Sequence, residues 1–111
     1  MLHGNRIREQ IKANDFVETL RNYGAERIEC SSHAFFRLSG KQRTLFTCES
    51  IRRILLEESP ELAGIQHNGC YTAFYKHKNN KFIRIILDMK ADRAEVVTFY
   101  VIGERQLPVI K

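Results

Sequence analysis

Residues 70–102, with the sequence CYTAFYKHKNNKFIRIILDMKADRAEVVTFYVI, decide the fold. Apolar and polar side chains alternate along three parts of this stretch, which is the pattern of β-strands that bury one face. Asn79-Asn80 interrupts the alternation with residues that tolerate the positive φ of a tight hairpin, and residues 90–93 form a second polar turn. We therefore predict antiparallel strands over residues 70–78, 82–89 and 95–102.

The predicted turn also assigns side chains to the two faces of the sheet. If Asn79 and Asn80 alone form the turn, Tyr75 lies opposite Arg84, and only one register of the last strand keeps the core face apolar. The predicted core face holds Thr72, Phe74, Ile83, Ile85, Leu87, Val97, Phe99 and Val101. The predicted opposite face holds Tyr71, Tyr75, His77, Arg84, Asp88, Thr98 and Tyr100.

Upstream of these strands the apolar spacing changes to that of a helix. Asn14-Asp15 can cap a helix that ends at Gly24, and Ile7 and Ile11 are one helical turn apart in the preceding residues. We therefore predict that residues 1–24 form an N-terminal helical segment.

Residues 27–46 are predicted to contain a short strand and a second helix. The strand covers residues 27–30, where Ile28 alternates with charged neighbours. Ser31 or Ser32 then caps a helix that runs to about Leu38.

A third helix and a hairpin connect this region to the strands. Thr47 caps the helix, which Ser59-Pro60 ends because a residue before proline is disfavoured in the helical region. A short strand at residues 65–67 leads into Asn68-Gly69, a strong signal for a type I′ hairpin. Together these elements predict an α+β fold, with N-terminal helices on one face of an antiparallel sheet of three to five strands.

The composition is that of a globular protein. A chain of 111 residues is long enough for one domain, and it has no apolar run of the ~20 residues that cross a bilayer. The polar N-terminus does not resemble a signal peptide, so we expect a cytoplasmic protein with no membrane association. Three cysteines at wide spacing favour reduced thiols over a disulfide framework.

The charge suggests a class of partner. A net charge of +5 and a pI near 9.3 favour a polyanion. Tyrosines on the predicted polar face can stack on bases, while Arg84 and Thr98 can donate to phosphate oxygens. The alternative is that the tyrosines cover apolar neighbours and that Arg84 pairs with Asp88.

His33 and Arg37 are the main candidates for chemistry, because they lie one turn apart on the predicted second helix. A histidine in the first turn of a helix is kept neutral by the helix dipole and can act as a general base. Arg37 can donate to the same phosphate. His33 could instead act as a second cap or pack against Phe36.

No cofactor or metal is predicted. Cys30-x-x-His33 and His67-x-x-Cys70 have the spacing of zinc ligands, but each pair spans a change of element and the ordinary role of such cysteines is burial. The phosphate-binding loop, dinucleotide-binding and serine-hydrolase motifs are absent from the sequence.

Several of these motifs occur in an order found in a known group of proteins. The series runs from S-x-H-A-x-x-R at residues 31–37 through ESIRRILLEESP, Asn68-Gly69-x-Tyr71, Phe74-Tyr75-Lys76 and Arg84 to V-V-T-F-Y at residues 96–100. Over residues 27–102 it resembles a small bacterial and archaeal family of unknown function that is grouped by fold with BrnT-type and RelE-type toxins. Residues 103–111 form a tail without the basic element usual in RelE-type toxins.

The resemblance implies a RelE-like fold and a metal-independent endoribonuclease, in which the ribose 2′-hydroxyl attacks the adjacent phosphate. It also implies an antitoxin protein as partner. Two alternatives use the same surface: a non-catalytic RNA-binding module and a protein-interaction domain. By resemblance the catalytic residues are His33, Arg37, Arg84 and Thr98, and Lys41 or Arg43 stands in for a second arginine of the family. The predicted RNA-binding residues are Lys41 and Arg43 together with Tyr71, Tyr75, His77 and Tyr100 of the predicted polar face.

Overall fold

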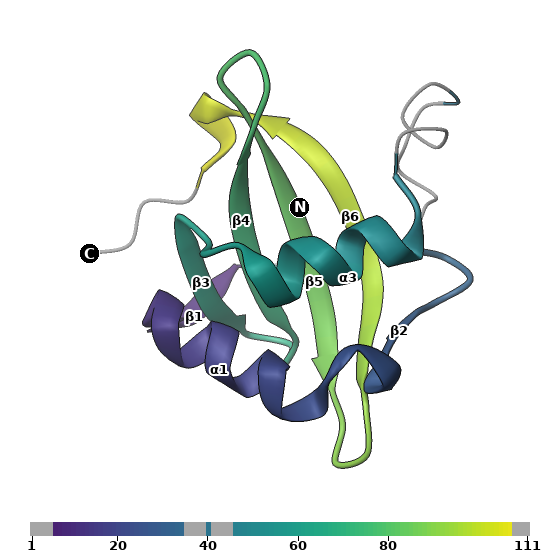
Figure 1. Ribbon diagram of the computed structural model, residues 1–111. Coiled ribbons are helices and arrows are strands. Elements are labelled where there is room, and N and C mark those ends of the chain that lie inside the picture. Colours follow the sequence, from purple (N-terminus) through teal and green to yellow (C-terminus); the bar gives the residue numbers. More distant parts are fainter. Residues whose placement is uncertain (1–5, 35–39, 41–45, 108–111) are drawn as a thin grey trace.

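The structure is a computed structural model that describes residues 6–34, 40 and 46–107. These residues form an α+β fold in which two helices accompany a six-stranded sheet (Figure 1). The elements in chain order are β1 Ile7–Ile11, α1 Ala13–Tyr23, the 3-10 turn η2 Ala25–Arg27, β2 Ile28–Cys30, α3 Cys48–Glu57, β3 Leu62–Gln66, β4 Tyr71–His77, β5 Lys81–Met89, β6 Ala94–Gly103 and the 3-10 turn η3 Glu104–Gln106.

The sheet is mixed and larger than predicted. Its strand order is β1-β3-β4-β5-β6-β2, and every neighbouring pair is antiparallel except β2 with β6. The predicted antiparallel sheet of three to five strands is therefore wrong in strand number and in the direction of one pair. The general α+β class is confirmed, and the three predicted long strands are found within two residues of their expected ends.

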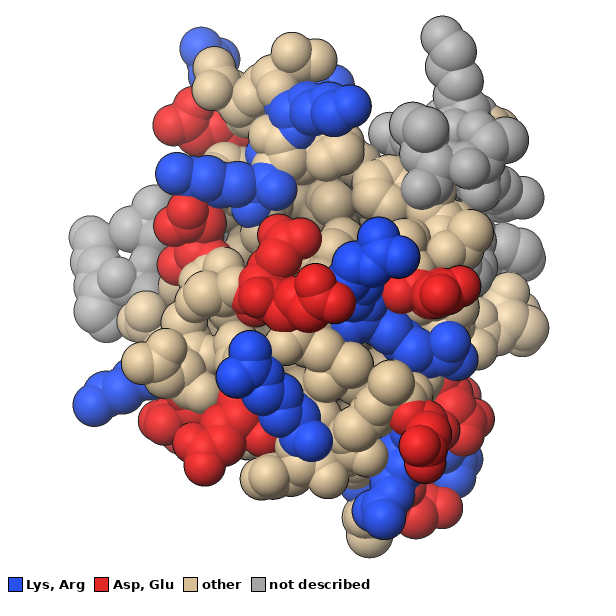
Figure 2. All heavy atoms as spheres, viewed as in Figure 1, with Lys and Arg blue, Asp and Glu red and all other residues tan. Residues whose placement is uncertain are grey.

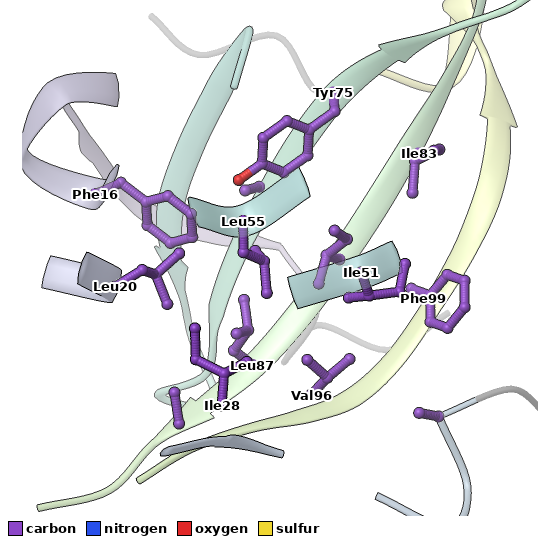
Figure 3. Close-up of a cluster of buried hydrophobic side chains, with 14 of the residues drawn as sticks. Phe16, Leu20, Ile28, Ile51, Leu55, Tyr75, Ile83, Leu87, Val96 and Phe99 are labelled. Atoms are coloured by element: carbon purple, nitrogen blue, oxygen red, sulfur yellow. The ribbon is translucent and has the colours of Figure 1, made fainter. Parts of the chain in front are cut away.

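Both helices lie on the same face of the sheet (Figure 1). They are joined by a hydrogen bond in which Arg21 Nε donates to the carbonyl of Leu56 at 3.0 Å. Figure 3 shows their apolar side chains against the central strands. The largest buried residues of this core are Phe16, Leu20, Ile28, Ile51, Leu55, Tyr75, Ile85, Leu87, Val96 and Phe99.

The helix ends follow local chemistry to different degrees. Thr47 caps α3 as predicted, in a reciprocal capping box in which Thr47 Oγ1 accepts from Ser50 N and Ser50 Oγ accepts from Thr47 N. Gly24 ends α1 as predicted, with a φ of 79°. The start of α1 differs, because it follows Lys12 without a side-chain cap instead of Asn14-Asp15.

The N-terminal helical segment at residues 1–24 is only partly correct. Residues 13–23 are helical, but Ile7–Ile11 form the edge strand β1, which pairs with β3. A spacing of four residues fits one face of a helix and equally one face of a strand, so the sequence spacing could not separate the two. The hydrogen-bonded pairing with β3 shows that Ile7–Ile11 form a strand. Residues 1–5 lie outside the described part of the chain.

Only the start of the predicted second helix lies within the described residues. Ser32–Ala34 form a turn in which Ala34 N donates to the carbonyl of Ser31, while residues 35–39 lie outside the described residues. The predicted strands on either side are confirmed at Ile28–Cys30 and, in longer form, at Leu62–Gln66.

Both hairpins on β4 have three-residue turns where the sequence predicted two. Gln66 is hydrogen-bonded to Cys70 across the first turn, and His77 pairs with Lys81 across the second. Asn79 and Asn80 have the expected positive φ, 59° and 58°. The added residue shifts the pairing of β4 by one position, so Tyr75 lies opposite Ile83 instead of Arg84.

A β-bulge changes which side chains at the start of β6 face the core. The register shifts between Ile86 and Leu87, so Val96 pairs with Leu87 while Thr98 pairs with Ile86. Val96 is therefore in the core in place of the predicted Val97, while Phe99 and Val101 contact the core as predicted.

A disulfide joins Cys30 to Cys48, with their Cα atoms 5.9 Å apart, whereas Cys70 is free. The expectation of three reduced thiols is therefore wrong. The pairing joins residues 18 positions apart, at the end of β2 and the first position of α3, and only the folded arrangement of these elements brings them together. No helix in the described residues is long and apolar enough to span a membrane.

Gly64 allows β1 to approach β3 closely. A Cβ atom at this position would lie 2.6 Å from Ile7 Cγ2 and 2.7 Å from the Glu9 carbonyl oxygen, whereas a Cβ at Gly40 has no atom within 4 Å. We predict that Gly64→Ala lowers the free energy of unfolding by about 1–3 kcal/mol, because backbone must shift to admit the methyl group. Urea unfolding of this variant and of the Gly40→Ala control tests the prediction; equal losses would contradict it.

Candidate functional site

Arg84 is the centre of the candidate site. Its neighbours in β5, Ile83 and Ile85, point into the helix-covered core, so the alternation of the strand directs Arg84 to the opposite face. Across the sheet Arg84 pairs with Phe74 in β4 and with Tyr100 in β6. The face of the sheet away from the helices therefore carries a cation between two aromatic residues.

The guanidinium is held by several neutral groups. Arg84 Nε donates to Thr72 Oγ1 at 3.0 Å, and Nη2 donates to Gln66 Oε1 at 2.8 Å. Nη1 donates to the Tyr100 hydroxyl at 3.4 Å, and the guanidinium carbon lies 5.0 Å from the centre of the Phe74 ring. Hydrogen bonds and a cation–π contact thus fix the orientation of the planar fork.

The residues that position Arg84 are themselves fixed. The Gln66 and Thr72 side chains are completely buried. Gln66 Nε2 donates to Asn68 Oδ1 at 3.1 Å, and the same oxygen accepts from Cys70 N at 3.0 Å. The first hairpin turn therefore orients the glutamine that orients the arginine. A guanidinium prepared in this way loses little side-chain entropy when it binds a phosphate or carboxylate.

Two other predicted site residues lie on the same face as Arg84. Thr98 and Tyr100 alternate with core residues along β6, and both are partly exposed. The predicted grouping of Arg84, Thr98 and Tyr100 is confirmed.

Tyr71 and Tyr75 do not belong to this face, contrary to the prediction. Tyr75 pairs with Ile83 and is 1% exposed, and Tyr71 packs against the same core. In Figure 3 the Tyr75 ring lies on the helix side of the sheet, near Phe16 and Leu55. Burial raises the pKa of Tyr75, with a further contribution from Glu58. The three-residue turn at residues 78–80, between β4 and β5, is the reason for this change of face.

His33 is exposed at the edge of the sheet, directly after β2. Its backbone N donates to Ser31 Oγ at 3.2 Å, and the next residue, Ala34, accepts a hydrogen bond from Phe99 N at 3.2 Å. His33 therefore lies beside β6, the strand that carries Thr98 and Tyr100. The predicted Arg37, Lys41 and Arg43 lie outside the described residues.

His77 is the last residue of β4, three positions after Phe74, which pairs with Arg84. Its ring centre is 5.7 Å from that of Phe46, which in turn makes an edge contact with Phe99 in the core. Burial lowers the pKa of His77, and the positive charges of Lys78 and Lys81 lower it further. The structure therefore separates His77 from the arginine face and joins it to the core-facing side.

The zinc-like spacings do not produce a cluster of ligands. Cys30 is bonded to Cys48 at one edge of the sheet, while His67 and Cys70 belong to the turn between β3 and β4. Among the residues that the structure describes, no three His, Cys, Asp or Glu side chains are arranged to hold a metal ion.

The sequence prediction missed the residues that orient Arg84. Two-residue turns place Thr72 and Phe74 on the core face, and Gln66 falls outside the predicted strands, whereas the structure brings all three to Arg84. A three-residue turn over residues 78–80 places Thr72 and Phe74 on the side of Arg84, and a three-residue turn over residues 67–69 places Gln66 there.

The described residues of the helix-covered face carry both signs of charge. Figure 2 shows acidic and basic side chains interleaved over α1 and α3. A hollow between these helices is lined by residues of both charges, including Glu18, Arg21, Glu57 and Glu58. A polyanion would therefore meet alternating repulsion and attraction on this side of the molecule.

No protein-family model, curated protein or solved structure matches the chain. The resemblance to RelE-type and BrnT-type toxins therefore depends on the sequence series alone.

The buried Tyr75 hydroxyl yields a stability prediction. Among the residues that the structure describes, this oxygen has no hydrogen-bond partner, whereas the Tyr23 hydroxyl donates to the carbonyl of Lys90. We expect Tyr75→Phe to raise the free energy of unfolding by about 1 kcal/mol and Tyr23→Phe to lower it by about the same amount. Denaturant unfolding of both variants provides the comparison. A loss for Tyr75→Phe as large as that for Tyr23→Phe would contradict the assigned burial.

The environment of His77 yields a pH prediction. Its imidazole should titrate below the ordinary value of 6.5, and Lys78→Gln with Lys81→Gln should raise the midpoint, while Lys12→Gln should leave it unchanged. Because the unfolded state takes up the proton first, His77 should reduce stability as the pH falls through 6.5 toward the lowered pKa. NMR titration of the ring measures the midpoint; a value at or above 6.5 would refute the prediction.

Proposed function

We propose that this protein acts on RNA as a metal-independent endoribonuclease, with a backbone phosphate bound at Arg84 and proton transfer by His33. The observation that carries the proposal is the orientation of the Arg84 guanidinium by Thr72, Gln66 and Tyr100. A fixed guanidinium beside an aromatic residue matches the two features of a nucleotide, a phosphate and a base.

The position of His33 supports a link between the two groups. The hydrogen bond from Phe99 N to the Ala34 carbonyl holds the His33 turn beside β6, and Tyr100 in β6 pairs with Arg84 in β5. Adjacent strands are about 4.8 Å apart, so the backbone at His33 is separated from that at Arg84 by about two strand spacings. Because both side chains extend from the backbone, a ribose 2′-hydroxyl at His33 and its adjacent phosphate at Arg84 can fit within this distance.

The reaction needs one group to accept a proton and another to stabilise charge. His33 would take the proton from a ribose 2′-hydroxyl, whose oxygen attacks the adjacent phosphorus. The bond to the 5′-oxygen of the next nucleotide then breaks, and that oxygen receives a proton. Arg84 would stabilise the added negative charge on the phosphate, with Thr98 and Tyr100 as neighbouring donors. Arg37 is included as a second phosphate-binding group because it follows His33 by four residues in the sequence.

The wider proposal, drawn from the sequence resemblance, is a RelE-like toxin held inactive by an antitoxin protein. A non-catalytic RNA-binding module is the second candidate. It is favoured by the place of Tyr71 and Tyr75 on the core side of the sheet, because this leaves the arginine face with fewer aromatic groups to position a scissile nucleotide.

RNA cleavage in EDTA tests the proposal. We expect His33→Ala to lower the cleavage rate at least 100-fold, in line with the ~10²–10⁴-fold contribution of general acid–base groups, without a matching loss of RNA affinity. Arg84→Gln should weaken binding and reduce the log–log salt slope by about 0.7, one phosphate contact on a single strand. Arg53→Gln is the control, because Arg53 is exposed on α3 and remote from the arginine face.

The outcomes separate the candidates. Equal cleavage by the parent and His33→Ala would refute the catalytic role of His33. Salt-sensitive binding by a parent that cuts no RNA would support the binding module instead. Affinity that is insensitive to both salt and Arg84→Gln would refute both.

A further inference from the structure

The disulfide between Cys30 and Cys48 joins two elements of different character. Cys30 is the last residue of the three-residue edge strand β2, and Cys48 is the first residue of α3. Both cysteines are partly exposed, so a small thiol in solution can reach the bond. The bond therefore lies at the edge of the sheet, where Cys30 packs against the border of the core.

The two sulfur atoms differ as leaving groups. Cys48 occupies the first position of a helix capped by Thr47, where the unpaired backbone N–H groups and the helix dipole stabilise a thiolate. Cys30 lies at a strand end and lacks this stabilisation. Each cysteine has one acidic neighbour in sequence, Glu29 or Glu49, so these charges do not remove the difference.

The fold contains a second connection between β2 and α3. Arg52, one helical turn after Cys48, donates through Nε to the carbonyl of Ile28 at 2.7 Å. Ile28 is also completely buried in the cluster that contains Ile51 and Leu55. Because these contacts do not involve sulfur, breaking the disulfide leaves the strand and the helix attached to each other.

The disulfide instead restrains the turn that carries His33. This residue is three positions after Cys30. Among the described residues, contacts of the turn with β6 include Ser31 N with the Val96 carbonyl and Phe99 N with the Ala34 carbonyl, and the Ala34 side chain is buried in the core while His33 itself is exposed. The two hydrogen bonds lie at the edge of the sheet, where local opening requires less free energy than in the centre. Loss of the covalent restraint would therefore increase the freedom of His33 more than that of the central strands.

We propose that Cys30–Cys48 is a reversible thiol–disulfide site, opened by a dithiol while the protein stays folded, and that its state sets the freedom of the His33 turn. A thiolate of the dithiol forms a bond to Cys30 Sγ, the Sγ–Sγ bond breaks, and its electron pair remains on Cys48. The second thiol then closes the dithiol into its own disulfide and releases Cys30. Two electrons and two protons pass to the protein. The proposal requires no RNA and is independent of the ribonuclease assignment.

Alkylation of the folded protein tests the site. In a Cys70→Ser background we expect no label without reductant and two labels after dithiothreitol, with the far-UV circular dichroism unchanged. Glutathione, a monothiol, should give a mixed disulfide on Cys30 with Cys48 free to alkylate, as located by peptide mass spectrometry. Cys30→Ser and Cys48→Ser variants show the labelling of each cysteine alone.

NMR of the histidine rings tests the effect on the turn. We expect the His33 resonances to shift and narrow after reduction, while those of His67, in the turn between β3 and β4, remain in place. Labelling without reductant, labelling only in denaturant, loss of the helical signal on reduction, or glutathione on Cys48 would each overturn the proposal. Unchanged His33 resonances would also overturn it.

Discussion

Strand pairing around β5 is the constraint on which the rest of the structure depends. This strand lies between β4 and β6, and its alternation sends Ile83, Ile85 and Leu87 to the helices. Arg84 is therefore placed on the other face by the same pairing that builds the core. A shift of β5 by one residue would bury a guanidinium under two helices, at a cost of several kcal/mol for an unpaired ion. The apolar core and the arginine face therefore both stabilise the observed register of β5 with β4 and β6.

That register has a chemical consequence on the arginine face. Pairing brings Thr72, Phe74 and Tyr100 around Arg84, and the neighbouring strand β3 supplies Gln66. Completely buried polar side chains such as Gln66 and Thr72 are stable only when they are hydrogen-bonded, and the guanidinium provides donors for both. The arginine consequently has a structural role, and the proposed binding of a phosphate would use the same position.

Strand and helix types were largely predictable from the sequence, because periodicity and local caps act over a few residues. Thr47 and Gly24 mark helix ends by their own chemistry. The faces of β4 were not predictable from Asn79-Asn80, because two-residue and three-residue turns accept the same residues with positive φ. The strand at Ile7–Ile11 and the Cys30–Cys48 bond depend on partners far away in sequence, which periodicity cannot reveal.

The candidate site therefore consists of two parts with different mechanical properties. Arg84 lies in the middle of the sheet, where pairing on both sides and buried acceptors restrict its motion. His33 is exposed at an edge, where the described contacts of its turn include backbone hydrogen bonds to β6 and the buried Ala34 side chain, with the disulfide nearby. A binding group needs a fixed position, and a proton-transfer group must reach the productive geometry with the substrate, which movement of an edge segment on binding can provide. The central strand can supply the first property, and the edge of the sheet can supply the second, so division of the site between them is consistent with both functions.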